Sequence, residues 1–372
     1  MSDAVDLAHL RRALQLAARG RFRTSPNPMV GAVIVRDGEV VGEGWHRRVG
    51  GPHAEIEAFR DAGERTRGAT LYVTLEPCDH HGRTPPCSLA TIEAGIARVV
   101  ACHRDPDPRV AGGGFSRLRA AGVEVIEGLR VEEAVRLNWK FLTSVVRRRP
   151  GVTLKWATSL DGKIATAAGD SQWISSPAGR RWALELRELH DAILVGSGTA
   201  LADDPRLDRR LGKADGPIVR VVMDRRLRLQ PEARLFQVDG PVLVYAAQAA
   251  DAGRRRALES AGAEVVILPT VDPPRILSDL GRRGLRSLLV EGGGSILAAF
   301  VESGCYDRVE VCCAPVLIGG SQALGPLAGR GFEPLAAAPR LTSLETRRRG
   351  PDLILSAFES SCLRDLSTSV VG

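Results

Sequence analysis

The sequence predicts an α/β protein of two domains, and three observations lead to this fold class. At 372 residues the chain exceeds the usual domain size of about 100–200 residues. Short apolar runs alternate with segments of helical spacing, a pattern typical of a sheet whose faces are covered by helices. The alternation stops around Arg147–Pro150 and then restarts, so we expect one domain over residues 1–147 and a second over residues 148–359.

In the first domain the pattern begins with a helix and a hairpin. Leu7, Leu10 and Leu14 recur at helical spacing, and two apolar runs flank Asp37-Gly38, a pair that favours a tight hairpin turn. Helices and strands then alternate, which predicts a layered α/β/α domain. The expected segments are the helices HAEIEAFRDAG, SLATIEAGI and FSRLRAAG and the strands ATLYVTL, ARVVAC and VEVIEG.

The second domain repeats the alternation and ends on an antiparallel pair of strands, RVEVCCAPVLIGG and DLILSAF. The segments expected before that pair are the helix SPAGRRWALELRELH and the strands VTLKWATSLDG, AILVG, IVRVVMD, PVLVYA, AEVVIL and RSLLVEG. Residues 360–372 are small and polar, and we expect them to form a disordered tail.

The composition argues against several classes of protein. The seven cysteines are odd in number and scattered, which disfavours a disulfide framework and favours a reducing cytoplasm. The first residues are partly acidic and have helical spacing, and no uncharged apolar stretch is long enough to cross a membrane, so we expect neither a signal peptide nor a membrane partner. The net charge of +7 comes mainly from scattered arginines and aromatic residues make up 4%, so we expect no nucleic-acid partner.

A zinc site is predicted by His53, Cys78 and Cys87, because a catalytic zinc takes three imidazole or thiolate ligands and keeps one position open for water. Glu55 follows the histidine by two residues at the start of a helix. It could stand beside the metal, take a proton from the activated water and pass it to a leaving amine.

The spacing of the two cysteines leaves two interpretations open. Zinc deaminases have His-x-Glu followed by Pro-Cys-x-x-Cys, whereas here the second cysteine comes nine residues after the first. The longer loop could widen the active-site wall for an unusual substrate. Alternatively, His80 or His81 could be a fourth ligand of a structural zinc, which would leave Glu55 without a role.

The segments PNPMVGAVIV, GEGWH, PHAE, TLEPCDHHGRTPPC and DPDP together resemble the deaminase half of the bifunctional riboflavin-biosynthesis deaminase/reductase family. The resemblance implies a cytidine-deaminase-like fold and zinc-dependent hydrolytic deamination of 2,5-diamino-6-ribosylamino-4(3H)-pyrimidinone 5′-phosphate. Family members often have Asn where this chain has Asp107, which replaces an amide with a group that only accepts hydrogen bonds when ionised. By motif match the base and phosphate contacts would be Asn27, His46, Arg83, Asp105 and Asp107, of which Asn27 and Asp105 could also be simple turn residues.

Two glycine turns mark the second half, at Gly196–Thr199 and at Gly292–Gly294, and each is followed by a helical segment. Such turns let a backbone approach a phosphate at a helix N-terminus, or they are tight turns only. The segments LKWATSLDGKIA, GDSQWISS, LADDPRL and VEGGGS resemble the reductase half of the same family, which implies a dihydrofolate-reductase-like fold. They also imply reduction of the ribosyl side chain to ribityl by NADPH.

The resemblance also implies contact residues in the reductase half. NADPH would contact Ala157, Trp173, Thr199, Asp203, Arg225, Gly293, Gly294, Ser295, Ile296, Leu297, Ala298 and Ala299. Substrate would contact Ser171, Arg187, Leu207, Arg210 and Glu291, with the arginines suited to a phosphate. Lys155 and Glu291 would relay a proton to the sugar or only anchor it. Arg225 stands where members commonly have Ser; it would pair with the 2′-phosphate of NADPH or face solvent, which leaves the choice between NADPH and NADH open.

We therefore expect an enzyme that acts on a small phosphorylated pyrimidine with Zn²⁺ and NADPH as cofactors, and the family's tendency to self-associate suggests a homo-oligomer. Two other functions stay open. A nucleic-acid base deaminase would bind structured RNA with strong salt dependence. A non-enzymatic module would hold zinc by four ligands and show no turnover.

Overall fold

The computed structural model of the chain describes residues 3–79, 85–107 and 112–371. The chain divides into two compact units, one formed by Met1–Arg147 with Leu363–Gly372 and the other by Arg148–Cys362. We call them unit 1 and unit 2. Each has its own sheet and its own hydrophobic cores, in agreement with the predicted α/β class.

The sheet of unit 1 has the strand order β2-β1-β3-β4-β5. β1 pairs antiparallel with β2 and β3, whereas β3, β4 and β5 run parallel. The β1–β2 turn is the predicted Asp37-Gly38 pair, with φ angles of 52° and 83°, a left-handed backbone that suits these residue types. The strands are β1 (Gly31–Arg36), β2 (Glu39–Trp45), β3 (Thr70–Val73), β4 (Arg98–Ala101) and β5 (Glu124–Glu127).

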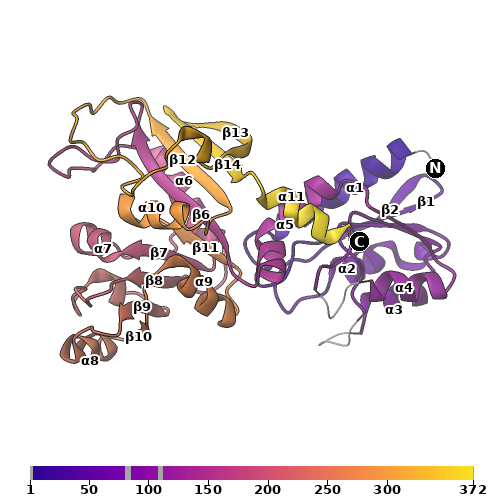
Figure 1. The fold of residues 1–372 in the computed structure, drawn as a ribbon. Coiled ribbons are helices and arrows are strands. Elements are labelled where there is room, and N and C mark those ends of the chain that lie inside the picture. The colour runs from indigo at the N-terminus through magenta and orange to yellow at the C-terminus, as the bar shows by residue number, and fades with distance from the viewer. Residues whose placement is uncertain (1–2, 80–84, 108–111, 372) are drawn as a thin grey trace. The chain divides into compact units, whose positions relative to one another are not determined.

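Helices cover both faces of this sheet and give the expected three layers (Figure 1). α1 and α5 pack on one face through Leu10 and Ala134, and α2 and α4 pack on the other through Ala58 and Phe115. α2 lies very close to β2, because a Cβ atom at Gly44 would overlap the α2 backbone. The helices are α1 (Asp3–Ala17), α2 (Ala54–Ala62), α3 (Cys87–Glu93), α4 (Gly113–Ala120) and α5 (Val131–Val146).

The expectation of a disordered tail over residues 360–372 is wrong, because α11 (Cys362–Val370) is a helix. Cys362, Leu366 and Val370 recur every four residues and are at most 2% exposed, so they form one buried stripe. The backbone carbonyl of Val370 accepts a hydrogen bond from the N–H of Arg104 at 3.3 Å, and Asp365 pairs with Arg147 at 3.0 Å. The polar residues between the stripe positions conceal this periodicity in the sequence.

The sheet of unit 2 has the order β10-β9-β8-β7-β11-β6-β12-β14-β13. It is parallel from β10 to β12, and the predicted antiparallel pair is β12 with β14. The strands are β6 (Gly151–Ser159), β7 (Ala192–Gly196), β8 (Val219–Met223), β9 (Val242–Ala247), β10 (Ala263–Leu268), β11 (Ser287–Val290), β12 (Arg308–Ala314), β13 (Leu341–Arg349) and β14 (Asp352–Glu359).

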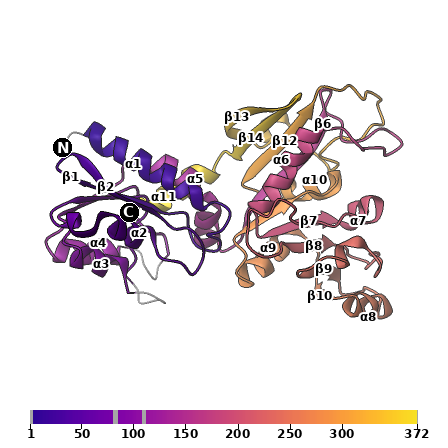
Figure 2. The same cartoon turned by 180° about the vertical axis from the view of Figure 1, so that it is seen from behind.

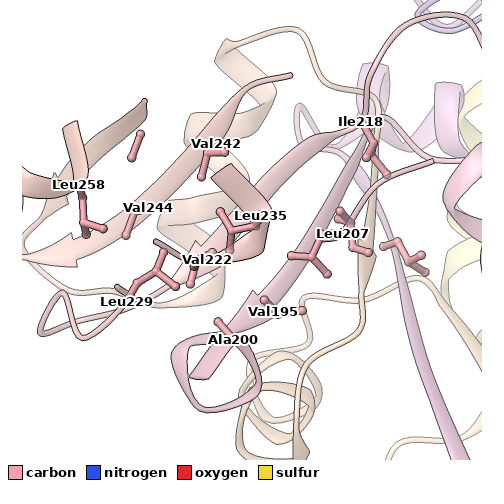
Figure 3. Close-up of a cluster of buried hydrophobic side chains, with 14 of the residues drawn as sticks. Val195, Ala200, Leu207, Ile218, Val222, Leu229, Leu235, Val242, Val244 and Leu258 are labelled. Atoms are coloured by element: carbon pink, nitrogen blue, oxygen red, sulfur yellow. The ribbon is translucent and has the colours of Figure 1, made fainter. Parts of the chain in front are cut away.

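Two hydrophobic cores fill the faces of this sheet. Figure 2 shows the strands and the helices that enclose them. One contains Trp182 of α6, Ala200 of α7 and Leu258 of α8, and Figure 3 shows part of it, where Val195 and Val222 of neighbouring strands meet Leu229 and Leu235. The other contains residues of α9 and α10. The helices are α6 (Pro177–Glu188), α7 (Ser197–Asp203), α8 (Ala252–Ser260), α9 (Pro273–Arg282) and α10 (Gly294–Glu302).

Within the described residues, no helix has the length and apolar character needed to cross a membrane.

Candidate functional site

The predicted zinc ligands come together in unit 1. His53 directly precedes α2, Cys78 follows β3 and Cys87 is the first residue of α3. Their ligand atoms all lie within 4.8 Å of one another, with His53 Nδ1 at 3.1 Å from Cys87 Sγ and at 3.6 Å from Cys78 Sγ. Ligands at about 2.0–2.3 Å from one tetrahedral zinc stand about 3.5 Å apart. The donor set therefore fits a zinc ion with a fourth position open.

The protonation of these groups is tightly linked. Hydrogen bonding from Cys87, and also from His53, lowers the pKa of Cys78 to about 4, although burial opposes this. The hydrogen bond with Cys78 raises the pKa of His53 to about 9. The hydrogen bond with Cys78 and burial raise the pKa of Cys87, so one thiolate is already favoured. A divalent cation that displaced the remaining protons would bind both sulfurs as thiolates.

Glu55 lies in the first turn of α2 and is only 3% exposed. Burial raises the pKa of its carboxyl, and the charge of His53, together with a weaker contribution from hydrogen bonding with Cys87, opposes that rise. A carboxyl that holds a proton more readily than usual, beside the donor set but not among the three donors, suits proton transfer. This is the position that the sequence predicted for it.

His46 and Asn27 join the same site. The rings of His46 and His53 meet edge to face, with centroids 5.6 Å apart. His46 Nδ1 lies 2.9 Å from the carbonyl oxygen of Pro52, which can only accept, so this nitrogen carries the hydrogen. Nε2 then accepts from the Asn27 amide nitrogen at 3.2 Å, and burial lowers the pKa of His46 and keeps the ring neutral. The Asn27 amide oxygen is thereby left to accept a hydrogen bond from a ligand.

Asp105 and Asp107 follow β4 and form a turn in which Asp105 Oδ1 accepts the N–H of Asp107 at 2.9 Å. The turn is held by Glu76, a residue that the sequence did not single out. The buried Glu76 carboxylate accepts the N–H groups of Asp105, Gly112 and Phe115 at 3.0–3.2 Å. Glu76 therefore fixes both ends of the segment that carries the two aspartates, and also caps α4.

Another unpredicted residue, Asn138 of α5, holds the segment after Asn27. Its amide accepts the N–H of Met29 and donates to the carbonyl of Met29, both at 2.8 Å. Arg83 and the alternative ligands His80 and His81 lie outside the described residues.

The predicted reductase residues gather around a cavity of about 1300 Å³ in unit 2, at the carboxyl ends of β6, β7, β8 and β11. Parallel α/β sheets place ligand sites at this edge. The predicted residues that line the cavity are Lys155, Ala157, Ser171, Trp173, Arg187, Thr199, Asp203, Leu207, Arg210, Arg225, Glu291, Gly293, Gly294, Ser295, Ile296 and Ala299.

Leu297 and Ala298 do not line it. Leu297 points into the core between α10 and the sheet, and Ala298 is 3% exposed. The helical turn of α10 explains the difference, because only one side of the helix faces the cavity. Leu207 lines the cavity and also packs into the core, where it is 1% exposed.

A buried ion-pair cluster marks one part of the cavity. Glu291 follows β11, and its two carboxylate oxygens accept hydrogen bonds from Arg187 at 3.1 and 3.0 Å. Lys155 Nζ lies 3.9 Å from the same carboxylate. Burial opposes ionisation of Glu291, but the charges of Arg187 and Lys155 overcome it and lower its pKa to about 2. Arg187 therefore forms an ion pair with Glu291, a contact that the sequence did not predict.

The two glycine turns lie beside each other. The N–H of Gly293 donates to Thr199 Oγ1 at 3.1 Å, which ties the turn before α10 to α7. Trp173 is 69% exposed at the rim, and the guanidinium of Arg180 lies over its ring at 4.7 Å. Arg206 and Arg210 share Asp208, at 2.9 and 2.7 Å.

Comparison with known proteins gives matches over both units. Residues 4–103 match the family model described as the cytidine and deoxycytidylate deaminase zinc-binding region, and residues 150–355 match the RibD C-terminal domain. The chain is 43% identical over 354 residues to the riboflavin biosynthesis protein RibD of Bacillus amyloliquefaciens, covering 94% of this chain and 95% of the relative. It is 44% identical over 366 residues to RibD of Escherichia coli, covering 94% and 98%.

Solved structures of RibD proteins are similar to this chain over nearly its whole length. RibD of Acinetobacter baumannii is similar with a TM-score of 0.87 at 36% identity, over 96% of this chain and 99% of that one. A diaminohydroxyphosphoribosylaminopyrimidine deaminase/5-amino-6-(5-phosphoribosylamino)uracil reductase of Thermotoga maritima is similar with a TM-score of 0.83 at 37% identity, over 96% and 99%.

Proposed function

We propose that unit 1 holds the deaminase site and unit 2 the reductase site, because this chain belongs to the RibD family. It is a bifunctional deaminase and reductase of riboflavin biosynthesis that uses zinc and NADPH. The relative from Thermotoga maritima is named for a diaminohydroxyphosphoribosylaminopyrimidine and for 5-amino-6-(5-phosphoribosylamino)uracil. We propose the same two compounds as the substrates here.

The observation that carries the deaminase assignment is the buried Glu55 next to the cluster of His53, Cys78 and Cys87. Those three residues would hold zinc, and the ion would supply an activated water as the nucleophile for the ring carbon. The Glu55 carboxylate would take up the proton of that water and deliver it to the leaving amino group. Its raised pKa favours keeping the proton between the two transfers.

Asn27, His46 and the Asp105–Asp107 turn would orient the pyrimidine. The neutral His46 fixes the Asn27 amide, so its oxygen is presented to a donor group of the base. The proposed contact between Arg83 and the phosphate is based only on the motif match. Asp107 would accept a hydrogen bond where an asparagine of the family could also donate one.

In unit 2, the cluster of Lys155, Arg187 and Glu291 would bind the ribosyl part of the substrate. NADPH supplies the hydride, and a proton must reach the sugar oxygen. Lys155 is the proposed donor, because its Nζ lines the cavity at 3.9 Å from the Glu291 carboxylate. Ser171, Leu207 and Arg210 would complete the substrate side. The proposed NADPH contacts are Ala157, Trp173, Thr199, Asp203, Arg225, Gly293, Gly294, Ser295, Ile296 and Ala299.

The two-site assignment is tested by one substitution in each unit. Glu55→Gln should abolish ammonia release, keep the zinc content measured by elemental analysis, and leave NADPH oxidation on the deaminated intermediate unchanged. Glu57→Gln, on the same helix but bound to Arg47 and Arg60 at the surface, is the matched control. Loss of both activities in a folded Glu55→Gln protein would contradict separate sites.

In unit 2, Lys155→Met should abolish NADPH oxidation while NADPH still binds, and Lys213→Met is the control because Lys213 pairs with Glu185 outside the cavity lining. Retained hydride transfer in Lys155→Met would reduce Lys155 to an anchoring residue.

We also propose self-association, which sedimentation of the purified chain tests, and a reducing cellular compartment. All seven cysteines lie within the described residues and none is in a disulfide, which supports such a compartment.

A further inference from the structure

Two charged residues beside the unit 2 cavity, Glu188 and Arg209, have no part in the proposed reductase function. Glu188 is the last residue of α6 and directly follows Arg187, and Arg209 directly precedes Arg210 in the segment that connects α7 with β8. Arg187 and Arg210 line the cavity, whereas Glu188 and Arg209 do not. Each of the two proposed substrate arginines therefore has a charged neighbour in the chain that points elsewhere.

The Glu188 carboxylate binds the backbone of residues 211–214, which directly follow Arg210. It accepts three backbone N–H groups at 2.9–3.0 Å, those of Leu211, Lys213 and Ala214. Gly212 has a left-handed backbone with φ of 62°, which lets neighbouring N–H groups converge on one anion. Glu188 is buried, and burial favours its neutral form, but the backbone hydrogen bonds outweigh burial and lower the pKa of its carboxyl. The carboxylate is thus a charged anchor for the chain after Arg210.

Arg209 makes the reciprocal connection, from the segment back to the end of α6. Its guanidinium donates to four backbone carbonyls at 2.6–3.3 Å, those of Arg187, His190, Asp215 and Gly216. α6 is itself fixed, because Trp182 and Leu186 are buried in the core. Glu188 and Arg209 therefore fasten the backbone on both sides of Arg210 to a fixed helix.

The start of the same segment is fixed by the core and by Asp208. Leu207 has a left-handed backbone with φ of 52° and is buried in the core shown in Figure 3. Asp208 accepts a hydrogen bond from Arg210 Nε at 2.7 Å. Burial favours a lower pKa for Arg187, but the charges of Glu291 and, less strongly, of Asp208 raise it, so Asp208 acts on both arginines. The two guanidinium groups therefore share one part of the cavity.

We propose that Glu188 and Arg209 are positioning residues of the reductase, which hold Arg187 and Arg210 together as one site for the phosphate of the substrate. Neither positioning residue would touch the substrate. Two guanidinium groups repel each other until an anion binds, so a fixed backbone is needed to keep them close together beforehand. A phosphate then receives paired, charge-assisted hydrogen bonds from both. The proposal rests on the reductase assignment of unit 2 and on the assignment of the two arginines to the substrate.

The test is a double-mutant cycle on the full-length chain, with NADPH oxidation measured at saturating NADPH against the concentration of 5-amino-6-(5-phosphoribosylamino)uracil. Glu188→Gln keeps the shape of the side chain but turns an amide NH₂ group toward at least one backbone N–H, because these groups contact both carboxylate oxygens. It should raise KM about 10-fold and change kcat less than about 2-fold, since Lys155 and Glu291 are untouched. If Glu188 acts through Arg210, the double variant E188Q/R210Q should have the KM of Arg210→Gln alone, within about 2-fold.

A second variant covers the case in which Glu188→Gln does not fold. Arg209→Lys keeps the positive charge but cannot reach four carbonyls, and it should raise KM and combine with Arg210→Gln in the same non-additive way. Arg181→Gln is the matched control, because Arg181 is exposed on the same helix outside the cavity lining, and it should change neither KM nor kcat. The dissociation constant of NADPH, measured by calorimetric titration, should be the same for every variant.

Three results would overturn the proposal. If the effects of Glu188→Gln and Arg210→Gln on KM multiply in the double variant, Glu188 does not act through Arg210. If NADPH binding weakens together with substrate binding, Glu188 supports the fold of unit 2 in general. An unchanged KM in a folded Glu188→Gln protein would show that the arginines do not depend on it. Failure of the proposed function looks different: an unchanged KM in Arg210→Gln would refute the substrate assignment of Arg210, and an unsubstituted chain that oxidised no NADPH would refute the reductase assignment of unit 2.

Discussion

Replacing Glu291 by glutamine should destabilise unit 2 strongly, because Arg187 and Lys155 would lose the carboxylate that they surround. The side chain of Glu291 is 10% exposed, and those of its two partners are 13% and 15% exposed. The pKa of Glu291 falls from 4.5 to about 2 in the folded chain. At about 1.36 kcal/mol per pKa unit, the carboxylate contributes about 3 kcal/mol to the free energy of unfolding. Removing one member of a buried ion pair typically costs about 3–5 kcal/mol, so the two magnitudes agree.

The same shift predicts a pH dependence. The folded pKa lies below the unfolded one, so this stabilisation is fully present above about pH 4.5 and is lost as the pH falls towards 2. At pH 3.5 it should be about 1.4 kcal/mol smaller than at pH 7. The difference in stability between the unsubstituted chain and Glu291→Gln should therefore narrow by that amount.

Urea unfolding at pH 7, 4.5 and 3.5, followed by circular dichroism, measures this difference. Addition of NADPH identifies the transition of unit 2, since a ligand raises the stability of the unit that binds it. Glu259→Gln, which breaks an exposed pair with Arg255 on α8, should cost less than about 0.5 kcal/mol. An equal midpoint for Glu291→Gln and the unsubstituted chain, or a gap that stays constant with pH, would refute the reasoning.

Three further outcomes are expected. Glu76→Gln should leave at least one of three backbone N–H groups without an acceptor and lower the free energy of unfolding of unit 1 by about 1–3 kcal/mol. Ammonia release should fall and NADPH oxidation should not change. Unchanged deamination would show that the turn at Asp105 and Asp107 does not depend on Glu76. Ending the chain after Ser361 should lower the melting temperature of unit 1 and slow deamination. The reason is that the N–H of Arg104, next to Asp105, loses its hydrogen bond to the carbonyl of Val370. A control chain that ends after Val370 should behave as the full chain does. Dialysis against a chelator should stop ammonia release and spare hydride transfer, and restoration by added zinc checks that the loss is reversible.

The zinc cluster and Glu55 could be predicted because the chemistry constrains both residue type and spacing. His and Cys are the commonest ligands of zinc, and His-x-Glu at a helix start brings both residues to the first turn. The hairpin at Asp37-Gly38 was predictable for the same kind of reason, since few residue pairs adopt its turn. In these places local chemistry limits the choices severely.

Other features depend on pairing that a sequence does not display. β13 is polar because it is a mostly exposed edge strand, so it shows no buried alternation. α5 was not among the predicted helices, although it supplies Asn138. Glu76 accepts hydrogen bonds from backbone N–H groups, which every residue except proline has, so no pattern of side chains in the sequence predicts its role.

α11 gives the chain a nested order of assembly. During synthesis most of unit 1 emerges first, then about 200 residues of unit 2, and only then the helix that completes unit 1. At about 5–20 residues per second, the surface that receives Leu366 and Val370 stays uncovered for about 10–40 s. Unit 2 is in effect an insertion within unit 1, so a chain broken anywhere inside the reductase part also lacks the last helix of the deaminase part. A ribosome that stalls there would release neither unit in finished form.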